Sequence, residues 1–427
     1  MENSSQTIPA NWAIRFFTIW TGQAFSLFGS QLVQFALVWY LTQKTGSATI
    51  LATATLAAML PQIILGPFAG AVVDRWSRRL IMILADSFIA LSTVGLILLF
   101  ISGKVQIWQI YVVMALRSLG GAFQFPAMSA STTLMVPNQH LTRVSGMNQT
   151  LQGIMSMIAP PAGALLIGVL PTQGVLMIDI ATAALAILPL FFISIPQPAR
   201  QPETNLTEKP NLVQDMRAGF SYVRAWPGLM AILFMALIIN FLLTPAGSLM
   251  PLLVTKYFGK GALEFGLTDT AFGFGFIVGG LLLSIWGGFK RKVTTSLSGI
   301  VGVGLGILLV GLAPANAFPL ALVGMGIVGI TNPLANGPLL ALVQSVVRED
   351  MQGRVMALIQ SAATAMTPLG LLIAGPVADA IGVRFWFWFG GLVCLLMGVG
   401  AFFVPAIMDV EKNHQPLPEE HGVIAEA

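Results

Sequence analysis

Long apolar runs separated by short polar connections make up most of the 427-residue chain. A bilayer core about 30 Å thick needs about twenty mostly apolar residues per helix, and this pattern predicts twelve membrane-spanning helices. The predicted spans are residues 14–41, 48–73, 80–101, 107–135, 144–169, 173–195, 228–254, 267–289, 293–312, 317–346, 354–378 and 384–407. The runs 107–135 and 317–346 are long enough to tilt or to extend past the bilayer.

One polar connection is much longer than the others and divides the twelve runs into six and six. It begins at Pro196, is rich in proline and charge, and continues to about Trp226, which is typical of an interdomain linker. The predicted fold class is therefore an all-α integral membrane protein of two six-helix bundles. We predict an N-terminal bundle over 1–196, a cytoplasmic linker over 197–226, a C-terminal bundle over 227–408 and a disordered tail over 409–427.

The two halves of the chain resemble each other. Arg143 opens the fifth predicted helix and Arg354 opens the eleventh, each followed by valine and, six residues on, by glutamine. A helix end broken by glycine and proline precedes each of them, ending at Pro126 and Pro333. An internal repeat in a membrane protein indicates a transporter whose site lies at the interface of the repeats.

Composition places the chain in lipid and orients it there. Hydrophobic residues make up 56% of the chain and the mean hydropathy is +0.83, more apolar surface than a soluble globule of this size can hide. Fifteen of the 21 lysines and arginines fall on the side of the termini, five fall on the other side, and Arg117 lies within a helix. Because positive charge gathers in the cytoplasm, we expect a multi-pass protein of the cell membrane with both termini cytoplasmic.

Several classes of protein are disfavoured. The single cysteine, Cys394, lies in an apolar run, and the three histidines lie in polar connections or the tail, so no disulfide or metal site is indicated. No nucleophile–base cluster suggests an enzyme, no charged ring or filter repeat suggests a channel, and no phosphate-binding G-x-x-x-x-G-K-[ST] loop suggests an ATP-driven pump. No basic stripe with interleaved aromatics suggests nucleic-acid binding.

Charge gathers between the second and third predicted helices, in the motif G-x-x-x-D-R-x-x-R-R. Anchoring by positive charge in the cytoplasm explains the arginines but not an acid held between a glycine and an arginine. The motif, with the six-plus-six plan, resembles the signature of the major facilitator superfamily. On this resemblance the gating residues are Gly70, Asp74, Arg75, Arg78 and Arg79.

Further segments narrow the resemblance. Trp20–Ser26, Leu41–Ser47, Leu134–Pro137 and Gly382–Trp386 look like the macrolide-efflux branch, of the drug:proton antiporter type, and more loosely like siderophore exporters. The resemblance implies export of bulky lipophilic compounds, driven by proton entry. We expect a monomer whose partners are its substrate, protons and membrane lipid, and which needs no cofactor. Export of another metabolite such as a siderophore, or movement of lipid, is the alternative.

The gating motif has a physical interpretation. The eleventh helix runs from the inside outwards, so its N terminus, with about half a positive charge, faces the cytoplasm. Asp74 can dock there, while Arg75, Arg78 and Arg79 reach acids or headgroups. Such contacts form only when the cytoplasmic ends of the halves meet, so we hypothesise a latch that favours the outward-facing state.

On the fifth helix, Pro160 and Gly163 partly match the antiporter motif G-P-x-x-G-G of the superfamily. Proline interrupts the helix hydrogen bonds, and small residues permit tight helix contact. Simple packing is the alternative interpretation of the same residues.

Three ionisable residues lie deep in predicted spans: Asp86, Arg117 and Asp179. A charge at mid-membrane costs at least about 2.5–3.5 kcal/mol, so each is a functional candidate. Either aspartate can partner Arg117, and the pair can serve proton coupling or form a permanent ion pair. No acid lies on the first helix, where many superfamily members carry one.

Polar stripes mark four helices, the first, fourth, seventh and tenth. These are the helices that, on the resemblance, line the central cavity of the superfamily, and amides turned to lipid are costly. Hydrogen bonding between helices explains any single amide equally well. The predicted substrate-cavity residues are Gln23, Gln31, Gln34, Gln124, Asn240, Asn332 and Asn336.

Overall fold

The computed structural model describes residues 11–196, 220–224, 226–347 and 349–411. In the first half of the chain its helices are α1 (Trp12–Thr45), α2 (Ala48–Arg75), α3 (Arg78–Ile101), α4 (Ile107–Met135), α5 (Asn138–Val169) and α6 (Thr172–Phe192). In the second half they are α8 (Pro227–Leu252), the π-helical turn η1 (Leu253–Tyr257), α9 (Ala262–Trp286), α10 (Lys292–Leu312), α11 (Phe318–Val346), α12 (Glu349–Ile381), α13 (Val383–Ala401) and α14 (Pro405–Met408). No strand occurs in these ranges.

Eleven of the described helices are long and apolar enough to cross a membrane. The exception among the twelve long helices is α4, whose 29 residues include Arg117 and Gln124. The predicted all-helical membrane fold is therefore confirmed, and the one long helix that does not meet the criterion for a membrane span carries two of the candidate site residues. The predicted linker 197–226 and tail 409–427 fall largely outside the described residues.

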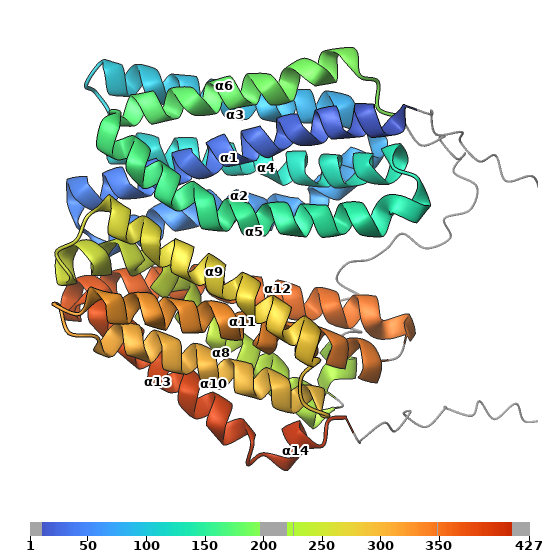
Figure 1. The fold of residues 1–427 in the computed structure, drawn as a ribbon, viewed down its shortest axis with the longest axis vertical. Coiled ribbons are helices and arrows are strands. Elements are labelled where there is room, and N and C mark those ends of the chain that lie inside the picture. Colours follow the sequence, from blue (N-terminus) through green and yellow to red (C-terminus); the bar gives the residue numbers. More distant parts are fainter. Residues whose placement is uncertain (1–10, 197–219, 225, 348, 412–427) are drawn as a thin grey trace, which may run out of the picture.

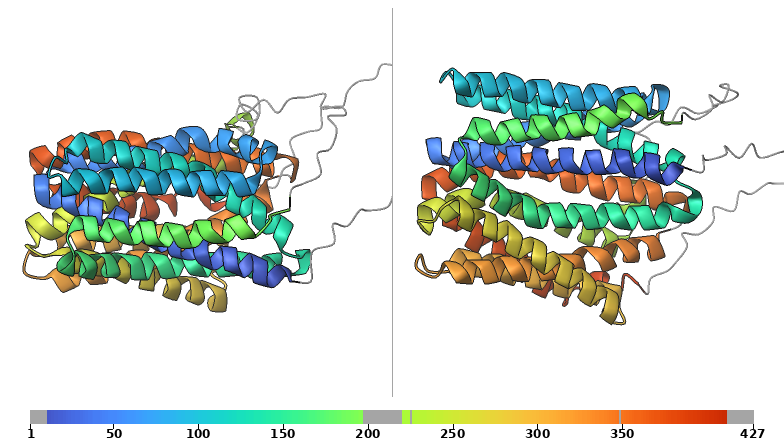
Figure 2. Two further views of the ribbon diagram at one scale, coloured as in Figure 1. Left: turned by 90° about the horizontal axis from the view of Figure 1, so that it is seen from above. Right: turned by 45° about the horizontal axis from the view of Figure 1, so that its top comes forward.

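The helices form two groups, α1–α6 and α8–α13, that lie against each other (Figure 1). Within both groups the long helices lie side by side along roughly one direction. Figure 2 shows the same alignment of the long helices from two other directions. We call the end at which α1 begins and α6 ends the basic end (Figure 1). Four arginines lie near the helix ends on this side: Arg15 in α1, Arg75 in α2, Arg79 in α3 and Arg143 in α5. The other end, with the α1–α2 connection, is called the opposite end.

Predicted and observed helix bounds differ most at polar ends. The second and third predicted helices are 48–73 and 80–101, whereas only Trp76 and Ser77 separate α2 from α3. The Ser77 hydroxyl accepts a hydrogen bond from the amide of Leu80 and so caps α3. A helix continues into polar sequence wherever a cap or a neighbouring helix supports it, which hydropathy alone does not register.

Small residues bring helices together inside each bundle. A Cβ on Gly22 of α1 would lie 2.6 Å from the carbonyl oxygen of Leu185 in α6. In the second bundle, a Cβ on Gly324 would lie 2.7 Å from the carbonyl oxygen of Gly306, where α10 crosses α11. Close backbone approach of this kind replaces the hydrophobic effect as the packing force within a membrane.

The backbones of the two bundles approach most closely along two helix pairs. At α2 and α12, a Cβ on Gly375 would lie 2.8 Å from the Cα of Thr49. At α5 and α9, a Cβ on Gly266 would lie 3.0 Å from the carbonyl oxygen of Pro160, and one on Gly273 would lie 3.2 Å from the Cα of Met157. We call these two contact lines the seam.

Toward the basic end the same helices part. Apart from the adjacent residues and the nearby backbone of the same helix, no heavy atom of the described chain lies within 4 Å of a Cβ built on Gly66 or Gly70 of α2, or on Gly146 or Gly153 of α5. The ribbons of the two bundles diverge in the same direction (Figure 1). The seam is therefore closed toward the opposite end and open toward the basic end.

Candidate transport pathway and its polar networks

An ion pair lies inside the first bundle. The Nη1 atom of Arg117 lies 2.6 Å from Oδ2 of Asp179, and its Nη2 atom donates to Oδ1 at 3.5 Å. Asp179 is 1% exposed and the side chain of Arg117 is 11% exposed. The structure therefore pairs Arg117 with Asp179, one of the two acids that the sequence left open.

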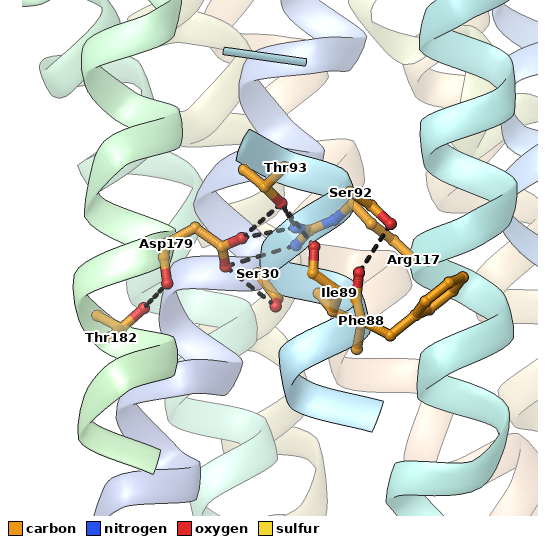
Figure 3. A network of polar contacts seen from close by, with 8 residues as sticks. All are labelled: Ser30, Phe88, Ile89, Ser92, Thr93, Arg117, Asp179 and Thr182. Atoms are coloured by element: carbon orange, nitrogen blue, oxygen red, sulfur yellow. Dashed lines mark hydrogen bonds and ion pairs between the residues drawn. The ribbon is translucent and has the colours of Figure 1, made fainter. Parts of the chain in front are cut away.

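Hydroxyl groups complete this network (Figure 3). Thr93 donates to Oδ2 of Asp179 at 3.0 Å and itself accepts from Arg117. Ser30 donates to Oδ1 of Asp179 at 3.3 Å. The four side chains come from α1, α3, α4 and α6, so a hydrogen-bonded charge pair joins four of the six helices. Gly29 of α1 makes room for it, since a Cβ there would lie 3.1 Å from the Cα of Asp179.

Asp86 belongs to a second network, nearer the basic end. Its Oδ2 atom accepts a hydrogen bond of 2.8 Å from Nε2 of Gln23, and the Oε1 atom of Gln23 accepts one from Gln124. Asp86 is 3% and Gln23 is 7% exposed. Gln23, predicted to line the cavity, is thus a buried bridge between α3 and α4.

The other glutamines of α1 have more open surroundings. Gln31 is exposed and Gln34 is partly buried. At 3.6 residues per turn, Gln31 lies about 80° around the helix from Gln23, and Phe35 lies about 120° around. Phe35 stacks on Phe265 of α9, with ring centroids 4.9 Å apart. Gln31 therefore lies between the face of α1 that contacts its own bundle and the face that contacts the other bundle.

The three candidate asparagines come together inside the second bundle. Asn240, Asn332 and Asn336 line one cavity of about 110 Å³ between α8, α10, α11 and α13. Asn240 donates to the carbonyl of Ala236 at 2.9 Å, and Asn336 donates to that of Asn332 at 3.1 Å. The remaining lining is mainly aliphatic, so the cavity offers an apolar wall with a few amide groups, as sites for lipophilic ligands do.

The gating motif lies at the basic end of the first bundle. Arg78 donates to the carbonyl of Ala130 at 2.8 Å, and Arg79 donates to the carbonyls of Leu190 and Phe191, the latter at 2.7 Å. These two arginines thus bind backbone carbonyls of α4 and α6, and their predicted contacts with acids or headgroups stay a prediction. Arg75 is exposed, and Gly70 has no contact that a Cβ would disturb. The side chain of Asp74 lies outside the described part of the structure, so the latch stays a prediction.

The antiporter-motif residues lie where three helices meet. A Cβ on Gly163 would lie 2.9 Å from the Phe35 ring of α1, and the carbonyl of Pro160 faces Gly266 of α9. Thr270 of α9 donates to the carbonyl of Met157 at 3.2 Å. The proline and the small residues of α5 therefore allow α5 to contact α1 and α9 at once.

Sequence reasoning missed an acid that closes the opposite end. Asp379, near the end of α12, accepts hydrogen bonds from the amides of Ala48 at 2.7 Å and Thr49 at 3.0 Å. The hydroxyl of Ser47 also donates to it, at 2.8 Å. The carboxylate of one bundle thus caps the N terminus of α2 in the other bundle, where the helix dipole favours negative charge.

Asp269 of α9 was also missed, because the predicted helix began at 267. The observed helix begins at Ala262, where Glu264 accepts a hydrogen bond of 3.0 Å from the amide of Gly261. Asp269 therefore lies seven residues inside the helix, about 10 Å along its axis. A signal was present, since an aspartate followed by a long apolar run was visible at that point.

Known proteins share both the sequence pattern and the fold. The family model described as Major Facilitator Superfamily matches residues 19–252 and 241–426. Macrolide efflux protein A of Streptococcus pyogenes is 33% identical over 402 residues, which cover 94% of this chain and 98% of that protein. The chain belongs to the major facilitator superfamily.

Other comparisons agree with this membership. The multidrug efflux pump Tap of Mycolicibacterium fortuitum is 26% identical to this superfamily member over 91% of the chain and 95% of the pump. Among solved structures, a bacterial homologue of the human lysosomal transporter Spinster matches with a TM-score of 0.71 at 13% identity, over 96% of this chain and 99% of that chain. These relatives are transporters, and this superfamily chain is a transporter and not an enzyme.

Proposed function

We propose that this transporter exports lipophilic compounds, macrolide antibiotics among them, in exchange for protons that enter the cell. The observation that carries the proposal is the one-sided closure of the seam, with Asp379 on the N terminus of α2 at one end and uncontacted glycines on α2 and α5 at the other. A transporter whose bundles are closed at one end and open at the other is in one of the two states of an alternating-access cycle. The macrolide efflux relative supplies the substrate class.

The orientation follows from charge. Arg15, Arg75, Arg79 and Arg143 lie at the basic end, and the excess of lysine and arginine marks the cytoplasmic side. On this assignment both termini are cytoplasmic and the structure is open to the cytoplasm, the state in which an exporter takes up its substrate.

The substrate class also suits the lining. The exposed Gln31 of α1 and the cavity with Asn240 and Asn332 provide amides set in apolar walls. Amides bind neutral and cationic groups alike, and the cavity of about 110 Å³ takes one apolar group of a larger lipophilic ligand. We expect Asn332→Leu to lower export of a macrolide while leaving folding intact, because an aliphatic side chain fits among the aliphatic residues of this cavity.

The predicted latch supplies the other half of the cycle. When the basic end closes, Asp74 docks at the N terminus of α12, as Asp379 docks on α2 in the present state. Since α2 and α12 pack together where α2 begins and α12 ends, we propose that the two contacts alternate, one at each end of this helix pair. Asp74→Asn is expected to lower the population that is open at the opposite end.

Drug accumulation in cells tests the export function. Bacteria with and without the protein are loaded with labelled compounds of several antibiotic classes, with and without an uncoupler. We expect lower macrolide accumulation in the expressing cells and loss of the difference on uncoupling. If macrolide levels are unchanged but those of a siderophore or a labelled lipid are reduced, that compound is the substrate and the macrolide proposal is wrong. Export that is insensitive to the uncoupler would reject proton exchange.

A further inference from the structure

Asp269 has no partner in the part of the chain that the structure describes. No hydrogen-bond donor and no cation contacts its carboxylate, although it lies within a membrane-spanning helix and is only partly exposed. The two other acids deep in the membrane are satisfied, Asp179 by Arg117 and Asp86 by Gln23. A carboxylate placed in the membrane without a counter-charge is costly and is a functional candidate by default.

The faces of α9 show where Asp269 lies. Gly266, Thr270 and Gly273 form the face against α5, and Gly275 and Gly279 form the face against α11. Asp269 lies between these two faces, about 40° around the helix from Phe265. The exposed side, with Leu267, Phe274 and Leu281 at 37%, 62% and 58%, is about 120–160° away from Asp269. Asp269 is therefore turned from lipid toward the seam between the bundles.

An aromatic layer separates Asp269 from the opposite end. Phe265, one turn nearer that end, stacks on Phe35 at 4.9 Å and lies 6.3 Å from Trp39. These three side chains are 7%, 6% and 7% exposed, and they come from both bundles. In the present state the layer is closed, and the helices part only on the basic side of it.

No fixed charge faces Asp269 from the helices packed around α9. Among described residues α11 carries no charged side chain, and the charged groups of α1 and α5 are Arg15, Lys44 and Arg143, all near helix ends. His140 of α5 is also near its end and stacks on Trp12. Glu264, on α9 itself, binds the amide of Gly261. The charge of Asp269 is thus free to be neutralised by a ligand.

We propose that Asp269 is the proton-binding site of the transporter, loaded from the opposite end and unloaded to the basic end as the aromatic layer of Phe35, Trp39 and Phe265 opens and closes. The inference rests on the proposed proton exchange and names its carboxylate. Rocking of the bundles separates Phe265 from Phe35, so the carboxylate one turn below becomes accessible from the other side. The acid of α9 then takes the place of the acid that α1 lacks, while Asp179 stays paired with Arg117 as a structural element.

Chemical labelling tests the site without transport. N,N′-dicyclohexylcarbodiimide modifies protonated carboxyl groups in apolar surroundings, and peptide mass spectrometry locates the adducts on the purified full-length protein. We expect modification at Asp269 that falls as the pH of the buffer rises, in wild type and in Asp269→Glu. Asp179, held by Arg117, is expected to stay unmodified in the same sample. Absence of an adduct at Asp269 at every pH, or an adduct confined to Asp86, would overturn the proposal.

Transport in vesicles supplies the second readout. Asp269→Asn is expected to retain exchange of labelled for unlabelled macrolide but to lose accumulation driven by a pH gradient, which is worth about ten-fold per pH unit for each proton exchanged. Glu264→Gln is the matched control on the same helix, and retained exchange shows that the variant is folded. Gradient-driven accumulation equal to wild type in Asp269→Asn would reject the site.

The two proposals fail separately. If the wild type moves no macrolide but Asp269 is labelled with the expected pH dependence, the export proposal is wrong and the proton site stands. If the wild type shows uncoupler-sensitive export while Asp269 is unlabelled, the export proposal stands and the proton site is wrong.

Discussion

The carboxylate of Asp379 accepts a hydrogen bond of 2.7 Å from the backbone amide of Ala48. The two residues belong to different bundles, at the end of α12 and the start of α2. Since the same carboxylate also binds the amide of Thr49 and the hydroxyl of Ser47, one side chain holds the opposite end of the seam closed. It does so with a helix cap, a contact that is broken and remade without repacking a core.

Asp379→Asn is expected to loosen this closure. An amide has one acceptor oxygen in place of two and carries no charge to match the helix dipole, so the cap weakens by about 1 kcal/mol, roughly five-fold in the ratio of closed to open states. Spin labels at the exposed positions Lys44 and Lys260 report the separation of the bundles at this end. The fraction of long distances between the labels should rise.

Glu264→Gln is the control for this measurement, because Glu264 caps its own helix at Gly261. Its distance distribution should match that of the wild type. An unchanged distribution in Asp379→Asn would show that the cap does not hold the closed state.

Gly375→Ala tests the close contact of α2 and α12. A Cβ at this position would lie 2.8 Å from the Cα of Thr49, and backbone cannot move aside as a flexible side chain does. Overpacking costs about 1–3 kcal/mol. Here it destabilises only the state in which α2 and α12 are in contact. The same spin-label pair should show longer distances, whereas Gly247→Ala, which meets no described heavy atom within 4 Å, should leave them unchanged.

A double-mutant cycle tests the ion pair of Arg117 and Asp179. Asp179→Asn or Arg117→Gln alone leaves one buried charge without its partner, which costs about 3–5 kcal/mol. The double variant removes both charges and should recover part of that loss. Thermal unfolding of the detergent-solubilised protein measures the three variants. Equal and additive losses would indicate that the two side chains do not stabilise each other.

Replacing Arg79 of the gating motif should destabilise the protein more than replacing Arg75. Arg79 donates to the carbonyls of Leu190 and Phe191 at the end of α6, and hydrogen bonds to a charged group contribute about 1.5–3 kcal/mol. Arg79→Ala should therefore lower the unfolding temperature. Arg75 is exposed, and Arg75→Ala should change it little. A larger drop in unfolding temperature for Arg75→Ala than for Arg79→Ala would contradict the assigned contacts.

Hydropathy predicted the helices well where apolar sequence ends abruptly. The predicted span 107–135 coincides with α4, because Gln106 and Pro137 bound it. The start of α9 was placed at 267 instead of 262 because Glu264 lowers the local hydropathy, whereas that glutamate in fact caps the helix. The same error placed Asp269 at a helix end, where an acid needs no explanation.

The polar networks were predictable only in part. The depth of each residue in its predicted span placed Arg117 near two acids, Asp86 and Asp179. The pairing with Asp179 depends on hydrogen bonds from Thr93 and Ser30, which short-range sequence patterns do not indicate. Gln23 and Gln31 share a polar stripe in the sequence, yet Gln23 is buried against Asp86 and Gln31 is exposed. The contact of Asp379 with Ala48 joins positions 331 residues apart, and no local pattern indicates it.

Exchange of a macrolide for protons is tested most directly in proteoliposomes that contain the purified protein and a pH-sensitive dye. When the side facing the opposite end is made acidic, a labelled macrolide should accumulate on that side while protons cross toward the basic end, and an uncoupler should abolish both movements. Accumulation of the macrolide to the same level without a pH gradient, or with no proton movement, would contradict the account.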